Sequence, residues 1–122
     1  MQINWSEQSR DDLREIVSYV GKTFGQQKAK EVFLEIRNNA ELLKNFPMLG
    51  KSFVKDEELQ IEYRTLPSKM NQLIYFVEEK TINIVAVWQN RRDINRLKKM
   101  LSKTEKLNYK EDIWIFAIFA RF

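Results

Sequence analysis

The sequence contains neither cysteine nor histidine, and these two absences exclude several classes of function. Without cysteine there can be no disulfide, no thiolate zinc site and no cysteine nucleophile. Without histidine the chain lacks the side chain that most often acts as a general base near neutral pH and most often binds a metal. We therefore expect no metal centre, no cofactor and no Ser-His-Asp hydrolase.

Targeting signals and long apolar runs are also missing. Residues 1–5 lack the positively charged start and the apolar stretch of a signal peptide. The longest apolar run, residues 113–120, is much shorter than the roughly 20 residues that a membrane span needs. Together with the absence of cysteine, these features predict a cytoplasmic protein that does not act at membranes.

The composition is that of one globular domain. The chain has 122 residues, of which 43% are hydrophobic and 31% are charged, so it can bury a single core. It has 21 Lys and Arg against 17 Asp and Glu, and the resulting charge of +4 is consistent with an acidic partner, either nucleic acid or protein.

The first half of the chain has two stripes of apolar residues at helical spacing. Ser6 stands where a helix N-cap is expected, and Gly21 or Gly25 can end the first helix. Pro47 and Gly50 end the second. The stripes comprise Leu13, Ile16, Val17, Val20 and Phe24, then Ala29, Val32, Phe33, Ile36, Ala40 and Leu43. Two helices with so short a connection predict an antiparallel helical hairpin.

After Gly50 the apolar residues follow the period of strands instead. Residues 59–64 alternate between apolar and polar side chains, and residues 73–77 and 81–88 are rich in strand formers. Short turns between them indicate an antiparallel meander. Helices followed by strands predict an α+β fold, in which the helical hairpin packs on a curved antiparallel sheet of three to five strands.

Basic residues gather after the last predicted strand and form a candidate target-binding surface. If the strands pair in order, Arg64 and Lys69 lie on the same surface, and Trp88 stands beside it, where it would stack on a base or pack over the helical hairpin or a protein partner. The cluster suits a nucleic-acid backbone, but it also fits the solvated face of a short helix. It contains Arg91, Arg92, Arg96, Lys98, Lys99, Lys103 and Lys106.

Three segments in this order resemble a known family. They are 64–67 (RTLP), 73–77 (LIYFV) and 82–93 (INIVAVWQNRRD). In the chain they follow a predicted helical hairpin that starts after Trp5 and Ser6. Residues 1–101 are similar to the RelE/ParE toxins of bacterial type II toxin–antitoxin systems. The resemblance implies a small cytoplasmic toxin that is silenced by an acidic or amphipathic antitoxin.

The family divides by target, and the resemblance leaves both branches open. RelE-like members are ribosome-dependent mRNA endoribonucleases, whereas ParE-like members inhibit DNA gyrase. Arg64 matches an arginine common to both branches, and Arg91 or Arg92 matches the arginine after the last strand. Glu62 is the one carboxylate that could act as a base, but it also fits a solvent-facing strand residue. The other positions of the ribonuclease site carry Gln60, Glu62, Gln72 and Leu97, so the set is depleted. This favours the ParE-like branch; a binding module without toxicity is a third interpretation.

The resemblance stops at residue 101, and residues 102–122 form an apolar C-terminal extension. Residues 103–112 are polar, whereas residues 113–119 are apolar at every position. A segment of this kind has to be covered on all sides. It would fold back over the sheet, associate with another copy, or be a loosely held extension without function.

Overall fold

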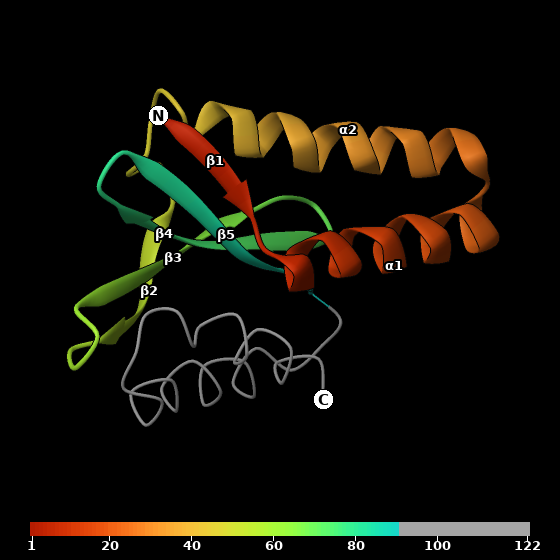
Figure 1. The fold of residues 1–122 in the computed structure, drawn as a ribbon. Helices are drawn as coiled ribbons and strands as arrows, with labels where there is room; N and C mark the ends of the chain where they lie inside the picture. The colour runs from red at the N-terminus through yellow and green to blue at the C-terminus, as the bar shows by residue number, and fades with distance from the viewer. Residues whose placement is uncertain (91–122) are drawn as a thin grey trace.

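The computed structural model describes residues 1–90, which form two helices and a five-stranded sheet (Figure 1). The elements are β1 (Gln2–Trp5), α1 (Glu7–Phe24), α2 (Gln26–Leu42), β2 (Lys51–Asp56), β3 (Ile61–Pro67), β4 (Asn71–Glu78) and β5 (Thr81–Gln89). The strands lie in the order β1-β5-β4-β3-β2. The predicted α+β class and the helical hairpin are confirmed. The predicted basic cluster and the extension from 102 to 122 lie outside the described residues.

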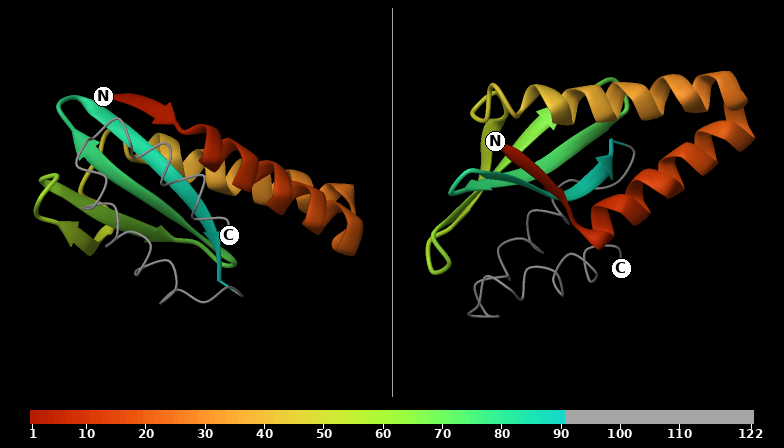
Figure 2. Two further views of the ribbon diagram at one scale, coloured as in Figure 1. Left: turned by 60° about the horizontal axis from the view of Figure 1, so that its bottom comes forward. Right: turned by 45° about the horizontal axis from the view of Figure 1, so that its top comes forward.

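The hairpin forms as its sequence predicts. The Ser6 hydroxyl accepts a hydrogen bond from the Ser9 amide at 2.9 Å and so caps α1, while Gly25 ends it with a φ of 97° that favours glycine. The turn at Gly25 projects beyond the sheet (Figure 1), and both helices lie on the same side of the sheet (Figure 2).

The sheet differs from the predicted meander at both edges. At one edge β1 pairs in parallel with β5, so the sheet is mixed rather than antiparallel. At the other edge β2 adds a strand that the sequence does not indicate, because residues 51–56 show no alternation of apolar and polar side chains. Leu59 belongs to the turn between β2 and β3 and not to the predicted strand. The antiparallel order of β3, β4 and β5 is confirmed.

The sheet has a buried cluster of side chains on each face. The helix face joins α1 and α2 to strand residues such as Leu73, Tyr75, Ile82, Ile84 and Val87. The opposite face, which we call the open face, carries a second cluster with no residue from either helix. Its members are Leu59, Ile61, Tyr63, Ile74, Phe76, Val85, Ala86 and Trp88.

A β-bulge in β5 places Trp88 on the open face. Tyr75 pairs with Ile84 and Ile74 pairs with Ala86, so Val85 is the extra residue. Strict alternation from Ile84 would direct Trp88 to the helices, but the extra residue reverses its side. Of the positions expected for Trp88, packing over the helical hairpin is therefore wrong, while contact with a protein partner stays a prediction.

Residues at the start of α1 form hydrogen bonds with the backbone of β5 beyond the end of β1. Strand β1 stops at Trp5, opposite Ile84. Beyond this point the Ser6 hydroxyl donates to the Val85 carbonyl at 2.9 Å, and the Val87 amide donates to Asp12 Oδ2 at 3.0 Å. The helix thus supplies the partners that a longer β1 would have supplied.

Candidate functional site

Arg64 lies on β3 with its guanidinium turned toward the chain itself. Its Nη1 donates to the Gly50 carbonyl at 2.7 Å and its Nη2 donates to Glu62 Oε1 at 2.6 Å. The arginine side chain is only 18% exposed, and Glu62 Oε2 also lies 3.6 Å from Lys55 Nζ. Both residues therefore have structural partners, and their catalytic roles stay predictions.

The Tyr75 hydroxyl holds the segment between α2 and β2 (residues 43–50) from inside the core. It donates to the Pro47 carbonyl at 2.9 Å and accepts from the Gly50 amide at 2.9 Å. Burial raises the pKa of Tyr75 above its ordinary value, against smaller lowering effects of the Gly50 bond and the charge of Arg64. The expectation that Tyr75 is a core residue whose hydroxyl needs a partner is confirmed.

A side chain at position 50 has no room in this arrangement. A Cβ there would lie 2.7 Å from the Tyr75 hydroxyl oxygen and 2.8 Å from the Thr65 carbonyl oxygen. Glycine thus permits the close approach on which the bonds of Arg64 and Tyr75 depend.

The tethered segment and the end of α2 present apolar side chains to solvent. They are 45–61% exposed, and they are Leu42, Phe46, Met48 and Leu49. Three large apolar side chains on a segment held by internal hydrogen bonds, with Leu42 of α2 beside them in the chain, are typical of a protein-contact surface.

The open face of the sheet has apolar residues at its centre and uncharged polar residues beside them. Cross-strand register places Thr65 opposite Ile74 and Gln72 opposite Trp88. Thr65 Oγ1 donates to Gln72 Oε1 at 2.7 Å, and Gln72 Nε2 donates to Asn90 Oδ1 at 3.1 Å. Trp88 is 2% exposed, so in this conformation its ring is not accessible to a nucleic-acid base. Its assignment to target binding stays a prediction.

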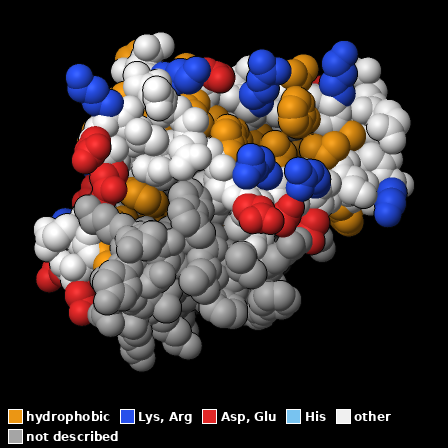
Figure 3. All heavy atoms as spheres, in the orientation of Figure 1, with side chains coloured by type: hydrophobic (Ala, Val, Ile, Leu, Met, Phe, Trp, Pro, Cys, Tyr) orange, Lys and Arg blue, Asp and Glu red, His pale blue; other side chains and the backbone are white. Residues whose placement is uncertain are grey.

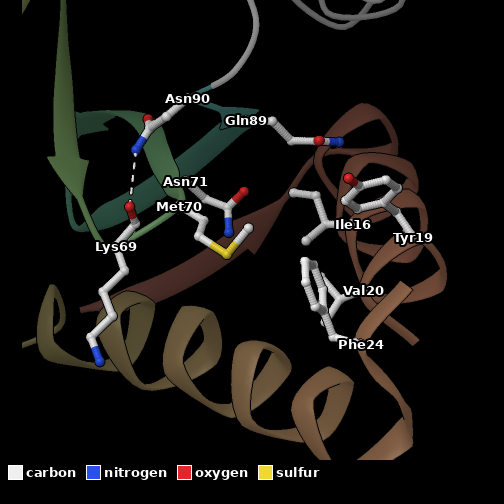
Figure 4. Close-up of a pocket in the computed structure, with 9 residues that line it drawn as sticks. All are labelled: Ile16, Tyr19, Val20, Phe24, Lys69, Met70, Asn71, Gln89 and Asn90. Carbon is white, nitrogen blue, oxygen red and sulfur yellow. Dashed lines mark hydrogen bonds between the residues drawn. The ribbon is translucent and has the colours of Figure 1, made fainter. Parts of the chain in front are cut away.

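Lys69 is exposed in the turn between β3 and β4, beside a hollow of about 250 Å³ (Figure 4). One wall of the hollow comes from α1, with Tyr19 and Phe24, and the other comes from Met70 and the end of β5. Asn90 lies beside Lys69: its side-chain amide donates a hydrogen bond to the Lys69 carbonyl at 3.5 Å, and its backbone N–H donates to the Met70 carbonyl at 2.8 Å (Figure 4). The structure places Lys69 at the point where the described chain ends, but Arg91, Arg92, Arg96, Lys98 and Lys99 lie beyond it.

A second hollow, which we call the hairpin groove, lies between β1 and the two helices and measures about 470 Å³. Its apolar lining comes from Ile3, Trp5, Leu13 and Phe33, all half-buried, and its polar lining from Asn4, Arg10, Arg37 and Glu41. On this face of the molecule, hydrophobic side chains show between Lys and Arg side chains (Figure 3).

Sequence reasoning missed the hairpin groove. The apolar stripes contain Leu13 and Phe33, which predicts that both are buried. Their position at the margins of the stripes was the available signal that they line a groove instead. Arg10 and Arg37 come from different helices, so only the folded hairpin brings them to one groove.

Over residues 1–90 no group of three or more Asp and Glu side chains is placed to hold a metal ion. Within the same range, no helix is long and apolar enough to cross a membrane.

Comparison with known proteins agrees with this architecture. Residues 3–94 match the family model described as the ParE toxin of the type II toxin–antitoxin system parDE. A solved structure described as the chromosomal ParDE TA system from P. aeruginosa superposes with a TM-score of 0.57 at 20% identity, over 73% of this chain and 95% of that one. A search of curated proteins found no match. Since the family model covers most of its length, the chain belongs to the ParE family of type II toxins.

Proposed function

We propose that this toxin arrests bacterial growth by inhibiting DNA gyrase in the cytoplasm and does not cut mRNA. The observation that carries the proposal is the chemistry of the open face. The side chains that β3, β4 and β5 place there, from Ile61 to Trp88, include no lysine or arginine within the described residues, and Lys51 reaches this face only at its edge, from β2 opposite Thr65.

RNA cleavage needs cations at the reacting phosphate, because negative charge accumulates on its oxygens in the transition state. It also needs a base to activate the 2′-hydroxyl and an acid to protonate the leaving oxygen. On β3, Arg64 and Glu62 bond to each other and to other parts of the fold. A set already engaged in this way supports inhibition of a protein target over phosphate chemistry.

The same proposal assigns an antitoxin to the hairpin groove. The apolar lining from Trp5, Leu13 and Phe33 fits the apolar side chains of an amphipathic segment. Arg10 and Arg37 fit acidic residues on the same segment. We therefore expect a short acidic, amphipathic antitoxin segment, encoded in the reading frame beside the toxin.

Two readouts after induced expression in bacteria test the target. Loss of plasmid supercoiling with intact transcripts is expected, and the purified protein should block supercoiling of relaxed plasmid by gyrase. Transcripts cut at codon positions with normal supercoiling would instead establish the ribonuclease. Growth without either defect would show a binding module without toxicity and would also refute the proposal.

Charge reversal tests the antitoxin site separately. Arg10→Glu combined with Arg37→Glu should slow antitoxin association by about tenfold and flatten its dependence on salt. The control is Lys22→Glu, which makes the same kind of change on α1 outside the hairpin groove and should leave the association rate nearly unchanged. Equal effects of the two variants would contradict this assignment.

A further inference from the structure

The open face of the sheet is an apolar surface with no helix on it in the described part of the chain. Tyr63, Phe76 and Trp88 contribute large rings to it, and Tyr63 and Phe76 meet edge to face with centroids 5.9 Å apart. Among residues 1–90, the hydrophobic side chains that pack against it from outside the cluster are Phe53 and Val54 of β2. Three aromatic rings on a sheet face without a helical layer indicate that a further segment docks there.

The chemistry of this face favours an apolar occupant. Its polar neighbours Thr65 and Gln72 bond to each other, and the cation that the register places on this face, Lys51, lies on the edge strand β2 opposite Thr65. The hairpin groove differs, because Arg10 and Arg37 line it. An acidic antitoxin segment therefore suits the hairpin groove, whereas the open face suits an apolar, neutral segment.

The chain itself contains such a segment. Residues 113–119 read IWIFAIF and carry no charge. The 22 residues from 91 to 112 connect them to the described domain, and at about 3.3 Å per extended residue they can reach roughly 70 Å. Strand β5, with nine residues, is about 30 Å long by the same measure, so the connection is ample.

We propose that residues 113–119 dock on the open face of the same molecule. The docked segment buries the rings of Tyr63, Phe76 and Trp88 and its own apolar side chains together. The antitoxin then meets a toxin whose sheet is already covered and binds to the hairpin groove without displacing the extension. This proposal goes beyond the target: it concerns what covers the open face, and its test does not depend on inhibition of gyrase.

Paramagnetic relaxation in the full-length chain tests the contact directly. Since the sequence has no cysteine, Ala120→Cys gives one labelling site for a nitroxide just beyond the segment. Docking predicts strong broadening of the amide signals of Tyr63, Phe76 and Trp88. The signal of Val32 in α2, on the far side of the sheet, should be broadened much less.

Two controls show whether the broadening comes from docking within one molecule. A nitroxide at Lys22→Cys, on α1, should leave the open-face signals sharp. The second control mixes nitroxide-labelled protein at natural isotope abundance with ¹⁵N-labelled protein that carries no nitroxide. The ¹⁵N signals should show no broadening if the contact is intramolecular. Broadening in the mixture would mean that the extension of a second copy occupies the open face. Sharp open-face signals in the Ala120→Cys sample would mean that the extension does not dock. Either result overturns the proposal.

A substitution in the segment gives an independent check. Ile115→Asp in the labelled chain should abolish the broadening, because a carboxylate is costly to bury among the apolar side chains of this face. Thr104→Asp adds the same charge in the polar part of the extension and should preserve the broadening. If both variants retain it, residues 113–119 are not the docking segment and the proposal fails.

Discussion

Replacing Tyr75 with phenylalanine tests how the segment of residues 43–50 is held. The variant keeps the ring in the core but removes the hydroxyl that bonds to the Pro47 carbonyl and the Gly50 amide. Gly50 is buried, so its N–H would lose its partner without gaining water. An unsatisfied buried group costs about 1–3 kcal/mol, and since Pro47 is half-buried we expect a total loss of about 2 kcal/mol in unfolding free energy.

Urea unfolding measures this loss, and amide hydrogen exchange locates it. The Gly50 amide should exchange faster in Tyr75→Phe, whereas amides in the middle of α1 should change only by the global loss of stability. Tyr19→Phe is the matched control, since Tyr19 is 38% exposed and the same deletion there should change the free energy by less than about 0.5 kcal/mol. An unchanged unfolding free energy together with unchanged Gly50 exchange would refute the reasoning.

Three further predictions follow from the same contacts. Burial raises the pKa of Tyr75 in the folded protein above the unfolded value of about 10. The unfolding free energy should therefore keep its full value below about pH 10 and fall as the pH rises toward the pKa of the folded state. Tyr75→Phe should show a smaller fall in urea titrations across this range. Gly50→Ala should lower the unfolding free energy by about 1–3 kcal/mol, because its Cβ would lie 2.7 Å from the Tyr75 hydroxyl. Asp12→Ala should cost about 2–3 kcal/mol by removing the charged acceptor of the Val87 amide, whereas Asp11→Ala, at an exposed ion pair, should cost less than about 1 kcal/mol; equal losses by urea unfolding would contradict this account.

The helices were predictable because their signals are local. Ser6 caps α1 through a bond to an amide three residues away, and Gly25 ends it through its own φ. The apolar stripes fix which side of each helix meets the sheet. In contrast, the parallel pairing of β1 with β5 joins Gln2 to Thr81, across most of the described chain, and no local pattern reports it.

The candidate site was predictable only as a set of residue types. The sequence indicates that a core tyrosine needs a hydrogen-bond partner, but the partners of Tyr75 lie 25 and 28 residues earlier in the chain. The side on which Trp88 lies depends on one bulged residue, Val85, which ordinary strand alternation does not anticipate. Long-range contacts and small register changes therefore set the limit of prediction here.

Arg64 shows why a matching residue type is weak evidence for a catalytic role in this fold. A planar guanidinium can bond to the Gly50 carbonyl and to Glu62 at the same time, whereas the single ammonium group of lysine does not provide that fork. Arg64 is therefore explained by its role in holding the segment of residues 43–50, whether or not the protein acts on RNA. The presence of Arg64 does not distinguish the two kinds of toxin. The proposed inhibition of gyrase rests instead on the open face, where the described residues of β3, β4 and β5 place no lysine or arginine, because phosphate chemistry needs cations at the place where the substrate lies.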